Sequence, residues 1–384
     1  MKLAVIGAGL IGAAAARHLA LQGHDITLIG PGEPADRSTH TGVFASHYDE
    51  GRITRSLDPH PFWSRASRNS IARYAEIEAQ SGIRFYSGVG CLMAGPAGSP
   101  KVESMLSVQT RDAIPCEPYS GDTLRDRFPY FAFPEGSLAL YEPLNAGHVS
   151  PRLLARAQLT AAIRAGAKLI PEEVTALRED SHGVTLTTES GTHSFDRVLL
   201  ATGGFSKLLL GETLPMTVYA RTVVLFRIEE AEIRRLAGMP SMIWMPVDED
   251  NPYLLPPIRY PDGQTYLKMG ADPDNTVLET RADLTDWFRS DGNPAAVDQV
   301  RPVLLRHMPG LDIAQTATLS CVTTYTPNEL PHLVSLSPRI HTAIGGCGRA
   351  AKNSDELGRL GALLLTDQPL PDWAAVAAQA STTA

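Results

Sequence analysis

The chain has 384 residues, of which 43% are hydrophobic and 20% charged, and its formal net charge is -8 at pH 7. This length and apolar content support a large buried core and favour two domains over one. The acidic balance, with no basic run, argues against nucleic acid and anionic membranes as partners, so we expect a small-molecule ligand.

Cysteine usage and hydropathy narrow the class further. The cysteines have neither C-x-x-C spacing nor the density of a disulfide framework; they are Cys91, Cys116, Cys321 and Cys347. No apolar run is long enough to span a bilayer, and internal repeats are absent from the sequence. We therefore expect a cytoplasmic protein without a metal site and without a membrane partner.

The beginning of the chain, KLAVIGAGLIG at residues 2–12, joins a short apolar run to glycines in G-x-G-x-x-G spacing. We predict a strand over residues 3–6, a tight turn at Gly7, close approach of a pyrophosphate at Gly9 and close helix packing at Gly12. A helix ended by Gly23 and a second strand over residues 25–29 complete the pattern. The stretch is typical of a nucleotide-binding βαβ unit.

Two other interpretations of this stretch are a signal peptide and a buried glycine turn without a ligand. Three glycines suit the apolar segment of a signal peptide poorly, and the pattern continues beyond it. A lone G-x-G-x-x-G is weak evidence, whereas this one opens a full βαβ pattern. Gly30 stands where an acidic residue usually binds the adenosine ribose, and Glu33 is the candidate substitute.

The next segments lead into the second domain. Residues 30–55 predict a loop with a concentration of side chains that are either surface charges or ligand contacts, namely His40, His47, Arg52 and Arg55. Residues 59–82 predict one amphipathic helix, and residues 83–149 predict short strands and turns.

The later segments return to the first domain and leave it again. A helix capped by Ser150 is followed by DRVLLATGG at residues 196–204, which predicts a buried parallel strand entering a glycine turn. Residues 216–321 predict strands and helices of the second domain. We expect the chain to end in a helix from near Asp355 and a disordered tail of about a dozen residues.

Several segments, in this order, resemble a known family: GAGLIG, SHYDEGRITR, LRDRFPYF, EPLNAGHVSP, DRVLLATGG, YLKMG, CVTTYTP and GGCGRAAK. The chain resembles the FAD-dependent amine oxidases of the D-amino-acid oxidase superfamily, most closely the monomeric sarcosine oxidase and N-methyltryptophan oxidase branch. The resemblance covers nearly the whole chain. It implies FAD as cofactor, a monomer, and an amine or amino-acid substrate with O2 as the second reactant.

The resemblance also implies the fold class. It predicts an α/β protein, α+β overall, with a glutathione-reductase-like FAD-binding domain that begins with the Rossmann βαβ unit. A substrate domain with a mixed sheet is expected beside it. The FAD-binding domain is predicted to comprise residues 1–82, 150–215 and 322–384, and the substrate-binding domain residues 83–149 and 216–321.

Cofactor contacts follow from the same resemblance. Cys321 aligns with the cysteine that carries the flavin through a thioether, and its alternative is an inert buried cysteine. The other implied cofactor-binding residues are Gly7, Gly9, Leu10, Ile11, Gly12, Glu33, Ser46, Arg52, Val174, Ala201, Thr202, Gly203, Gly345, Gly346, Gly348 and Lys352.

Catalytic roles are implied in the same way. Lys268 aligns with the lysine that activates oxygen beside flavin N5, and Arg55 and Lys352 align with the cations that hold the substrate carboxylate. His47 and Arg52 align with positions beside the flavin, and Tyr253 is a candidate for the tyrosine that covers the substrate, in a segment read as a loop, residues 251–260.

The substrate pocket departs from the family pattern. Asp272 stands where sarcosine oxidase has a histidine, Thr323 where it has a tyrosine, and GRAA replaces GHGF at residues 348–351. A carboxylate at position 272 favours a more basic substrate than sarcosine.

The expected activity is an FAD-dependent oxidase of secondary-amine amino acids, N-methyl or cyclic, that gives an imine and hydrogen peroxide. One alternative is a D-amino-acid or glycine oxidase, or an amine dehydrogenase, with primary-amine substrates. Another is a flavin-binding or nucleotide-binding subunit without catalysis.

Overall fold

The first apolar run forms β1 (Lys2–Ile6), which lies in the middle of a six-stranded sheet. The computed structural model describes residues 1–248, 251–270 and 275–379. β1 is parallel to both of its neighbours, β2 and β13, as the βαβ pattern predicts. The sheet order is β19 (His332–Ser335), β20 (Ile340–Ile344), β13 (Arg197–Leu200), β1, β2 (Asp25–Ile29) and β9 (Lys168–Ile170).

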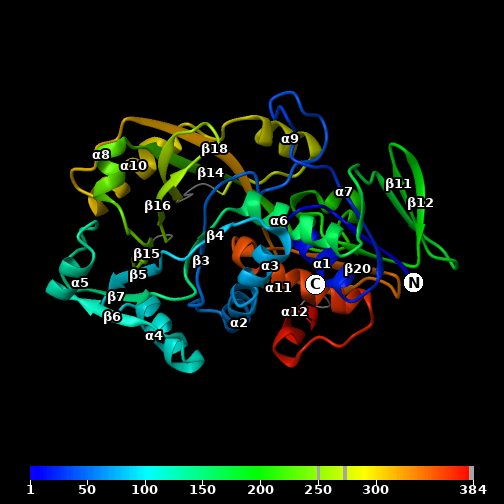
Figure 1. Cartoon of the computed structure of the whole chain (residues 1–384), viewed down its shortest axis with the longest axis horizontal. Coiled ribbons are helices and arrows are strands. Elements are labelled where there is room, and N and C mark those ends of the chain that lie inside the picture. Colours follow the sequence, from blue (N-terminus) through cyan, green and yellow to red (C-terminus); the bar gives the residue numbers. More distant parts are fainter. Residues whose placement is uncertain (249–250, 271–274, 380–384) are drawn as a thin grey trace.

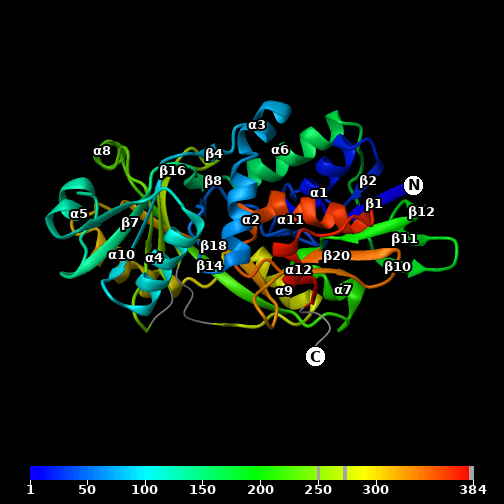
Figure 2. The ribbon, with the colours of Figure 1, turned by 90° about the horizontal axis from the view of Figure 1, so that it is seen from below.

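Alternation along β1 divides its side chains between two layers. Leu3 and Val5 pack with residues of the helices on one face, where α1 (Leu10–Leu21) and α11 (Ala350–Leu365) lie (Figure 2). Ala4 and Ile6 pack on the other face against a smaller sheet. That three-stranded sheet consists of β10 (Ala176–Glu179), β11 (Val184–Thr188) and β12 (Gly191–Phe195).

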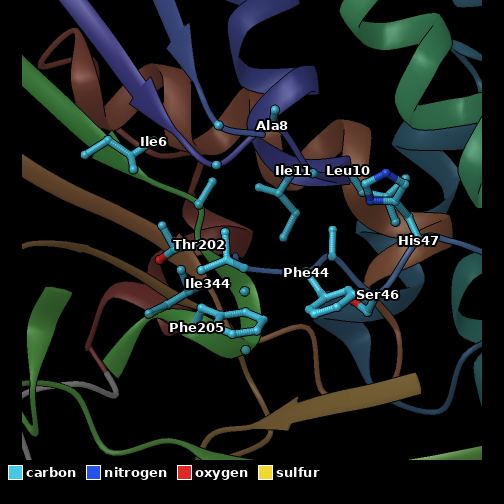
Figure 3. Close-up of a pocket in the computed structure, with 18 of the residues that line it drawn as sticks. Ile6, Ala8, Leu10, Ile11, Phe44, Ser46, His47, Thr202, Phe205 and Ile344 are labelled. Carbon is cyan, nitrogen blue, oxygen red and sulfur yellow. The ribbon is translucent and has the colours of Figure 1, made fainter. Parts of the chain in front are cut away.

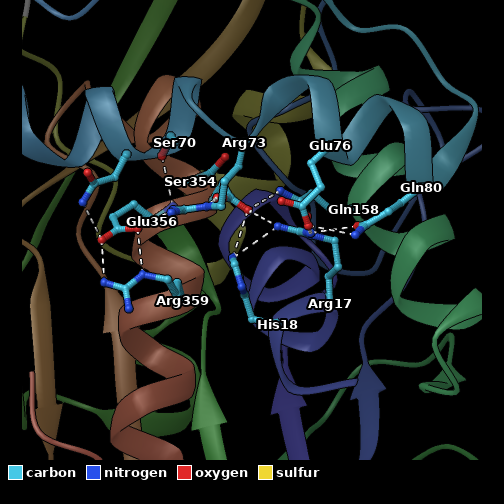
Figure 4. Close-up of polar contacts among 12 residues, drawn as sticks. Arg17, His18, Ser70, Arg73, Glu76, Gln80, Gln158, Ser354, Glu356 and Arg359 are labelled. Carbon is cyan, nitrogen blue, oxygen red and sulfur yellow. Dashed lines mark hydrogen bonds and ion pairs between the residues drawn. The ribbon is translucent and has the colours of Figure 1, made fainter. Parts of the chain in front are cut away.

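The helices on the first face are held by close packing and by buried charges. A Cβ on Gly358 of α11 would stand 2.6 Å from the Cβ of Ala14 on α1, so this glycine permits the two helices to touch. Asp355, fully buried on α11, is hydrogen-bonded by Arg17 from α1 and by Arg73 (Figure 4). Further helices on this face are α2 (Pro61–Ile71), α3 (Tyr74–Ser81) and α6 (Pro151–Arg164).

A second large sheet of eight strands lies beside the first (Figure 1). Neighbouring strands in this sheet are antiparallel, except that β5 and β15 are parallel to each other. The order is β18 (Gln315–Tyr325), β14 (Thr217–Arg227), β17 (Thr265–Gly270), β16 (Tyr253–Arg259), β15 (Ser241–Trp244), β5 (Cys91–Pro96), β7 (Ser137–Glu142) and β6 (Glu117–Ser120). The helices between these strands are α4 (Pro100–Asp112), α5 (Gly121–Arg127), α8 (Glu230–Arg235), α9 (Arg281–Arg289) and α10 (Ala296–His307).

A second three-stranded sheet joins three distant segments. It has the order β3 (Arg52–Thr54), β8 (Gly147–Val149) and β4 (Tyr86–Ser87), all antiparallel. Ile53 pairs with His148 in this sheet, so a segment that follows the nucleotide-binding unit is fixed against the chain just before α6. The assignment of a separate domain to each large sheet stays a prediction.

Several predicted elements were correct in kind and wrong in extent. Residues 59–82 form two helices, because the chain turns at Arg73, whose N–H bonds to the carbonyl of Ser70. The helix predicted to begin near Asp355 begins at Ala350. The predicted disordered tail is wrong up to residue 379, since residues 372–379 are helical and Trp373 contacts Phe62 at 5.4 Å between ring centroids.

Two predictions missed regular elements. Residues 83–149 contain the helices α4 and α5 in addition to short strands. Residues 253–259, read as a loop, form strand β16, whose prolines fit because the register shifts between Leu255 and Ile258. Within the described ranges no helix is both long and apolar enough to cross a membrane.

Candidate cofactor and active site

A large cavity opens at the carboxyl end of β1, where the chain enters α1 (Figure 3). It holds about 1160 Å³ of empty space, the open solvent at its mouth included. Its side chains are largely apolar and include Ile6, Ile11, Phe44, Phe205 and Ile344. The position, at the start of a helix that follows a parallel strand, is where this sheet type binds phosphate groups.

The glycines around this mouth form a cradle that side chains would close. Gly7 has a φ of +106°, and a Cβ there would lie 2.5 Å from the carbonyl oxygen of Ala201. A Cβ on Gly12 would lie 1.8 Å from the oxygen of Gly7, and one on Gly30 2.5 Å from the nitrogen of Ala8. Gly9, by contrast, would meet only His47, at 4.0 Å. The backbone of Gly9 is therefore open to a ligand, and the residues present fit the pyrophosphate of a dinucleotide.

A smaller cavity continues from the large one and shares Ala45, Ser46, Tyr48 and Phe288 with it. It holds about 290 Å³ and is lined by Asp49, Arg52 and Cys321. Arg52 donates a hydrogen bond to the Cys321 sulfur over 3.2 Å, and Trp287 donates to the Cys321 carbonyl over 2.7 Å. The two cavities thus form one elongated site with a thiol and a guanidinium at its inner end.

Lys268 approaches this inner end from β17. Its side chain is fully buried, contacts the Asp49 carboxylate and donates to the Gly51 carbonyl over 2.6 Å. Arg52 pairs with the same carboxylate, and the Tyr260 hydroxyl donates to it over 2.9 Å. Burial, together with the charge of Arg52, lowers the pKa of Lys268 well below its usual range.

A matching cluster lies at the other end of β3. Lys352 donates to Asp58 over 2.8 Å, and Arg55 and Arg349 each lie 3.8 Å from the same carboxylate. Burial and the charge of Arg55 lower the pKa of Lys352 to about 8. Although burial opposes it, Lys352 with the two arginines holds the pKa of Asp58 well below its usual range. Two lysines therefore stand beside one short strand, each with an aspartate and an arginine.

His47 and Tyr253 occupy different parts of the site. His47 lines the large cavity, where burial lowers its pKa to about 4, so its ring is neutral at pH 7. The ring of Tyr253, on β16, lies 5.9 Å from the Lys268 nitrogen.

Most of the sequence-predicted cofactor residues come together in the structure. Those that line the two cavities are Gly7, Gly9, Leu10, Ile11, Ser46, Arg52, Val174, Ala201, Thr202, Gly203, Cys321, Gly345 and Gly346. Gly12 stands behind the turn, and Lys352 belongs to the Asp58 cluster. Gly348 precedes α11 with a φ of +69°.

Two predicted residues are placed differently. Arg152 binds both carboxylate oxygens of Glu33, over 2.8 and 2.9 Å, and Glu33 is outside the cavity lining. Its role as a ribose ligand stays a prediction. Asp272 lies outside the described residues.

Sequence reasoning missed the aromatic walls and both aspartates. Phe44, an apolar residue in a polar loop, stacks on Phe288 with centroids 5.1 Å apart and lines the large cavity with it. Asp49 and Asp58 flank Arg52 and Arg55 at intervals of three residues. The sequence shows this spacing, but it does not show which lysine pairs with each aspartate.

Comparisons with known proteins agree with this geometry. A family model described as "FAD dependent oxidoreductase" (DAO) matches residues 2–364. The chain is 25% identical over 381 residues to N-methyl-L-tryptophan oxidase of Yersinia pestis (strain Pestoides F), covering 96% of each chain. In structure it is similar to NikD, "an unusual amino acid oxidase", with a TM-score of 0.78 and 20% identity over 100% of this chain and 98% of that one. Glycine oxidase from Bacillus cereus has a TM-score of 0.72 and 18% identity over 97% of each chain.

Proposed function

The chain belongs to the DAO family of FAD-dependent oxidoreductases and acts on CH–NH donors with oxygen as acceptor, and we propose that its substrates are secondary-amine amino acids, N-methyl or cyclic. The observation that carries the proposal is the pair of lysine, arginine and aspartate clusters at the two ends of β3, one of which lines the smaller cavity through Asp49 and Arg52. The products are an imine and hydrogen peroxide.

FAD fits the elongated site, with its pyrophosphate at the backbone of Gly9 and its ring system toward Arg52. Bound there, FAD supplies the redox chemistry by accepting a hydride and passing two electrons to O2. We assign Cys321 as the point of covalent attachment, because its sulfur lines the inner cavity beside a guanidinium. Attachment there would form one sulfur–carbon bond in place of the thiol S–H and one methyl C–H of the ring, and the two electrons and two protons released would reduce O2 to hydrogen peroxide.

The substrate is held by the second cluster. Arg55 offers the planar fork that matches a carboxylate, and Lys352 adds a second cation. Asp58 keeps both cations in place through its contacts with them. Anchoring the carboxylate there fixes the carbon beside the amine in one orientation, which is the contribution the protein makes to the reaction. The neutral ring of His47 lines the large cavity, and the Tyr253 ring lies beside Lys268.

Cofactor attachment is tested by precipitating the purified protein with acid and recording the spectra of pellet and supernatant. We expect yellow pellets from the wild type and from Cys116→Ser, a matched change at a half-buried cysteine, and a colourless pellet from Cys321→Ser. Flavin released into the supernatant of the wild type would contradict a covalent link and would indicate that FAD is a dissociable cofactor.

Substrate class is tested anaerobically by bleaching of the flavin. The panel consists of N-methyl amino acids, cyclic imino acids, glycine, D-amino acids and the N-methylamines that lack the carboxylate. We expect the first two groups to bleach the flavin fastest and to yield peroxide when air is admitted. Faster bleaching by glycine or D-amino acids would replace the proposal with a primary-amine oxidase, and no bleaching by any of them would contradict amine oxidation.

A further inference from the structure

Asp49 is the best-connected charged group at the inner end of the site. It is 4% exposed and lines the smaller cavity. One oxygen accepts from the Tyr260 hydroxyl at 2.9 Å and from the Glu50 N–H at 2.7 Å. The other contacts Lys268 and Arg52. The carboxylate is thus held in a fixed position between two cations.

Burial and Arg52 disfavour a charged amine at Lys268, whereas Cys321, the Gly51 carbonyl and the Tyr253 ring favour it without a carboxylate charge. In the sheet, Lys268 pairs with Leu225 on β14 and Leu255 on β16, and both leucines are buried. The titratable and charged groups that face it from the packed elements are Arg52 on β3, His148 on β8, Tyr253 on β16 and Cys321 on β18. His148 is neutral at pH 7, since burial lowers its pKa to about 4.

Asp49 is therefore what stabilises a cation at this position. Among the residues that the structure describes, it is the one carboxylate within ion-pair distance of Lys268. A buried amine next to a guanidinium loses its proton at neutral pH unless an opposite charge touches it. Burial and Arg52 already lower the pKa of Lys268, and loss of the Asp49 charge would lower it further.

We propose that Asp49 is a positioning residue that keeps Lys268 protonated and thereby sets the rate at which O2 is reduced. This inference rests on the proposed oxidase function. Dioxygen takes up one electron to become superoxide, an anion, and a second electron with two protons completes hydrogen peroxide; the reduced cofactor supplies both electrons. A fixed cation in a dry site stabilises the developing anion, whereas a neutral amine does not.

The test mixes chemically reduced holoenzyme with O2 in a stopped-flow instrument, without any amine substrate, between about pH 6 and pH 9.5. We expect the wild-type rate constant for reoxidation to decline as the pH rises through the pKa of Lys268, which burial and Arg52 lower. In Asp49→Asn this decline should begin ~1–3 pH units lower, with about a tenfold loss relative to the wild type at pH 8, because removal of a contacting opposite charge lowers a pKa by ~1–3 units. Asp49→Glu should restore the wild-type profile.

Two further variants serve as controls for this experiment. Lys268→Met should be slow at every pH. Asp262→Asn, a change at an exposed carboxylate that accepts from the Tyr266 hydroxyl at 2.7 Å, should behave as the wild type.

Several results would overturn the inference. One is reoxidation of Asp49→Asn with the wild-type rate and the wild-type pH profile, and another is an equal loss at all pH values, which would indicate a structural role alone. If Asp49→Asn fails to fold, a wild-type rate that declines with a midpoint near neutral pH overturns it as well. The reoxidation measurement uses no amine substrate. Failure of every substrate in the panel would therefore contradict the proposed substrate class without affecting the test of Asp49.

Discussion

Lys352 titrates within the pH range of ordinary assays, because burial and Arg55 bring its pKa to about 8. Below that pH the ammonium is present, and it is lost as the pH rises. If Lys352 holds the substrate carboxylate, the dissociation constant of a carboxylate substrate should increase as the pH rises above about 8. The increase should be about tenfold to a hundredfold, because this is the contribution of one hydrogen bond to a charged group.

The measurement is anaerobic flavin reduction as a function of substrate concentration and pH, which excludes any effect of Lys268 on oxygen. The matched N-methylamine without a carboxylate serves as the control, and its affinity should not follow the same profile. In Asp58→Asn the loss of affinity should begin at lower pH, because the carboxylate that stabilises the ammonium is gone. A carboxylate substrate whose affinity is constant across pH 8 would contradict the role of Lys352.

At the scale of elements, local patterns and long-range contacts differed in how well the sequence revealed them. The strand and glycine turn of β1, the Ser150 cap and the strand β13 depend on neighbouring residues, and each was predicted correctly. Strand β16 was missed because its prolines argue against a strand, and only the register shift against β17 accommodates them.

The same distinction explains the site. The glycine cradle could be predicted because close approach of backbones leaves a recurring glycine spacing. The ion pairs could not, since Lys268 lies 219 residues from Asp49 and Lys352 lies 294 residues from Asp58. Resemblance to the family supplied the lysines, but the aspartates beside them emerged only from the folded chain.

Asp355 accepts hydrogen bonds from several of the helices that cover the nucleotide-binding sheet. Loss of its charge should therefore lower the stability of the packing between these helices. Asp355 accepts from Arg17 of α1 at 2.9 Å and from Gln158 of α6 at 3.0 Å (Figure 4). Asp355→Asn removes the buried counter-ion of Arg17, which keeps only the half-exposed Glu76 at 3.3 Å, and we expect a loss of about 3–5 kcal/mol in the free energy of unfolding. Chemical denaturation measures it, and Asp25→Asn, on an exposed strand end, is the control that should leave the midpoint unchanged.

The pH dependence of this contribution has a definite sign. Although burial opposes it, His18, Arg73 and Arg17 lower the pKa of Asp355 well below its usual range. A depressed carboxyl pKa stabilises the fold above the unfolded value, about 4, and this stability is lost as the pH falls through the folded value. Asp355→Asn should therefore lose less stability than the wild type on acidification. Equal acid sensitivity of the two proteins would contradict this account.

At the scale of the whole molecule, β18 links the two large sheets through the cofactor site. The strand pairs along its length with β14 in the eight-stranded sheet, while Val322 and Thr324 line the large cavity opposite β1 and α1. A ligand in that cavity contacts both halves of the chain, so its binding should stabilise both. Binding at a hundred times the dissociation constant adds about 2.7 kcal/mol.

We expect apoprotein of Cys321→Ser to unfold at lower temperature than its FAD-loaded form, with a midpoint that rises with FAD concentration. Near-ultraviolet circular dichroism reports on both halves, because tryptophans lie in each: Trp63 and Trp373 in the first core and Trp244 in the second. If FAD couples the sheets through β18, one cooperative transition should move as a whole. A transition that splits, with only the part nearest α1 shifting, would show that the eight-stranded sheet is stable without the cofactor.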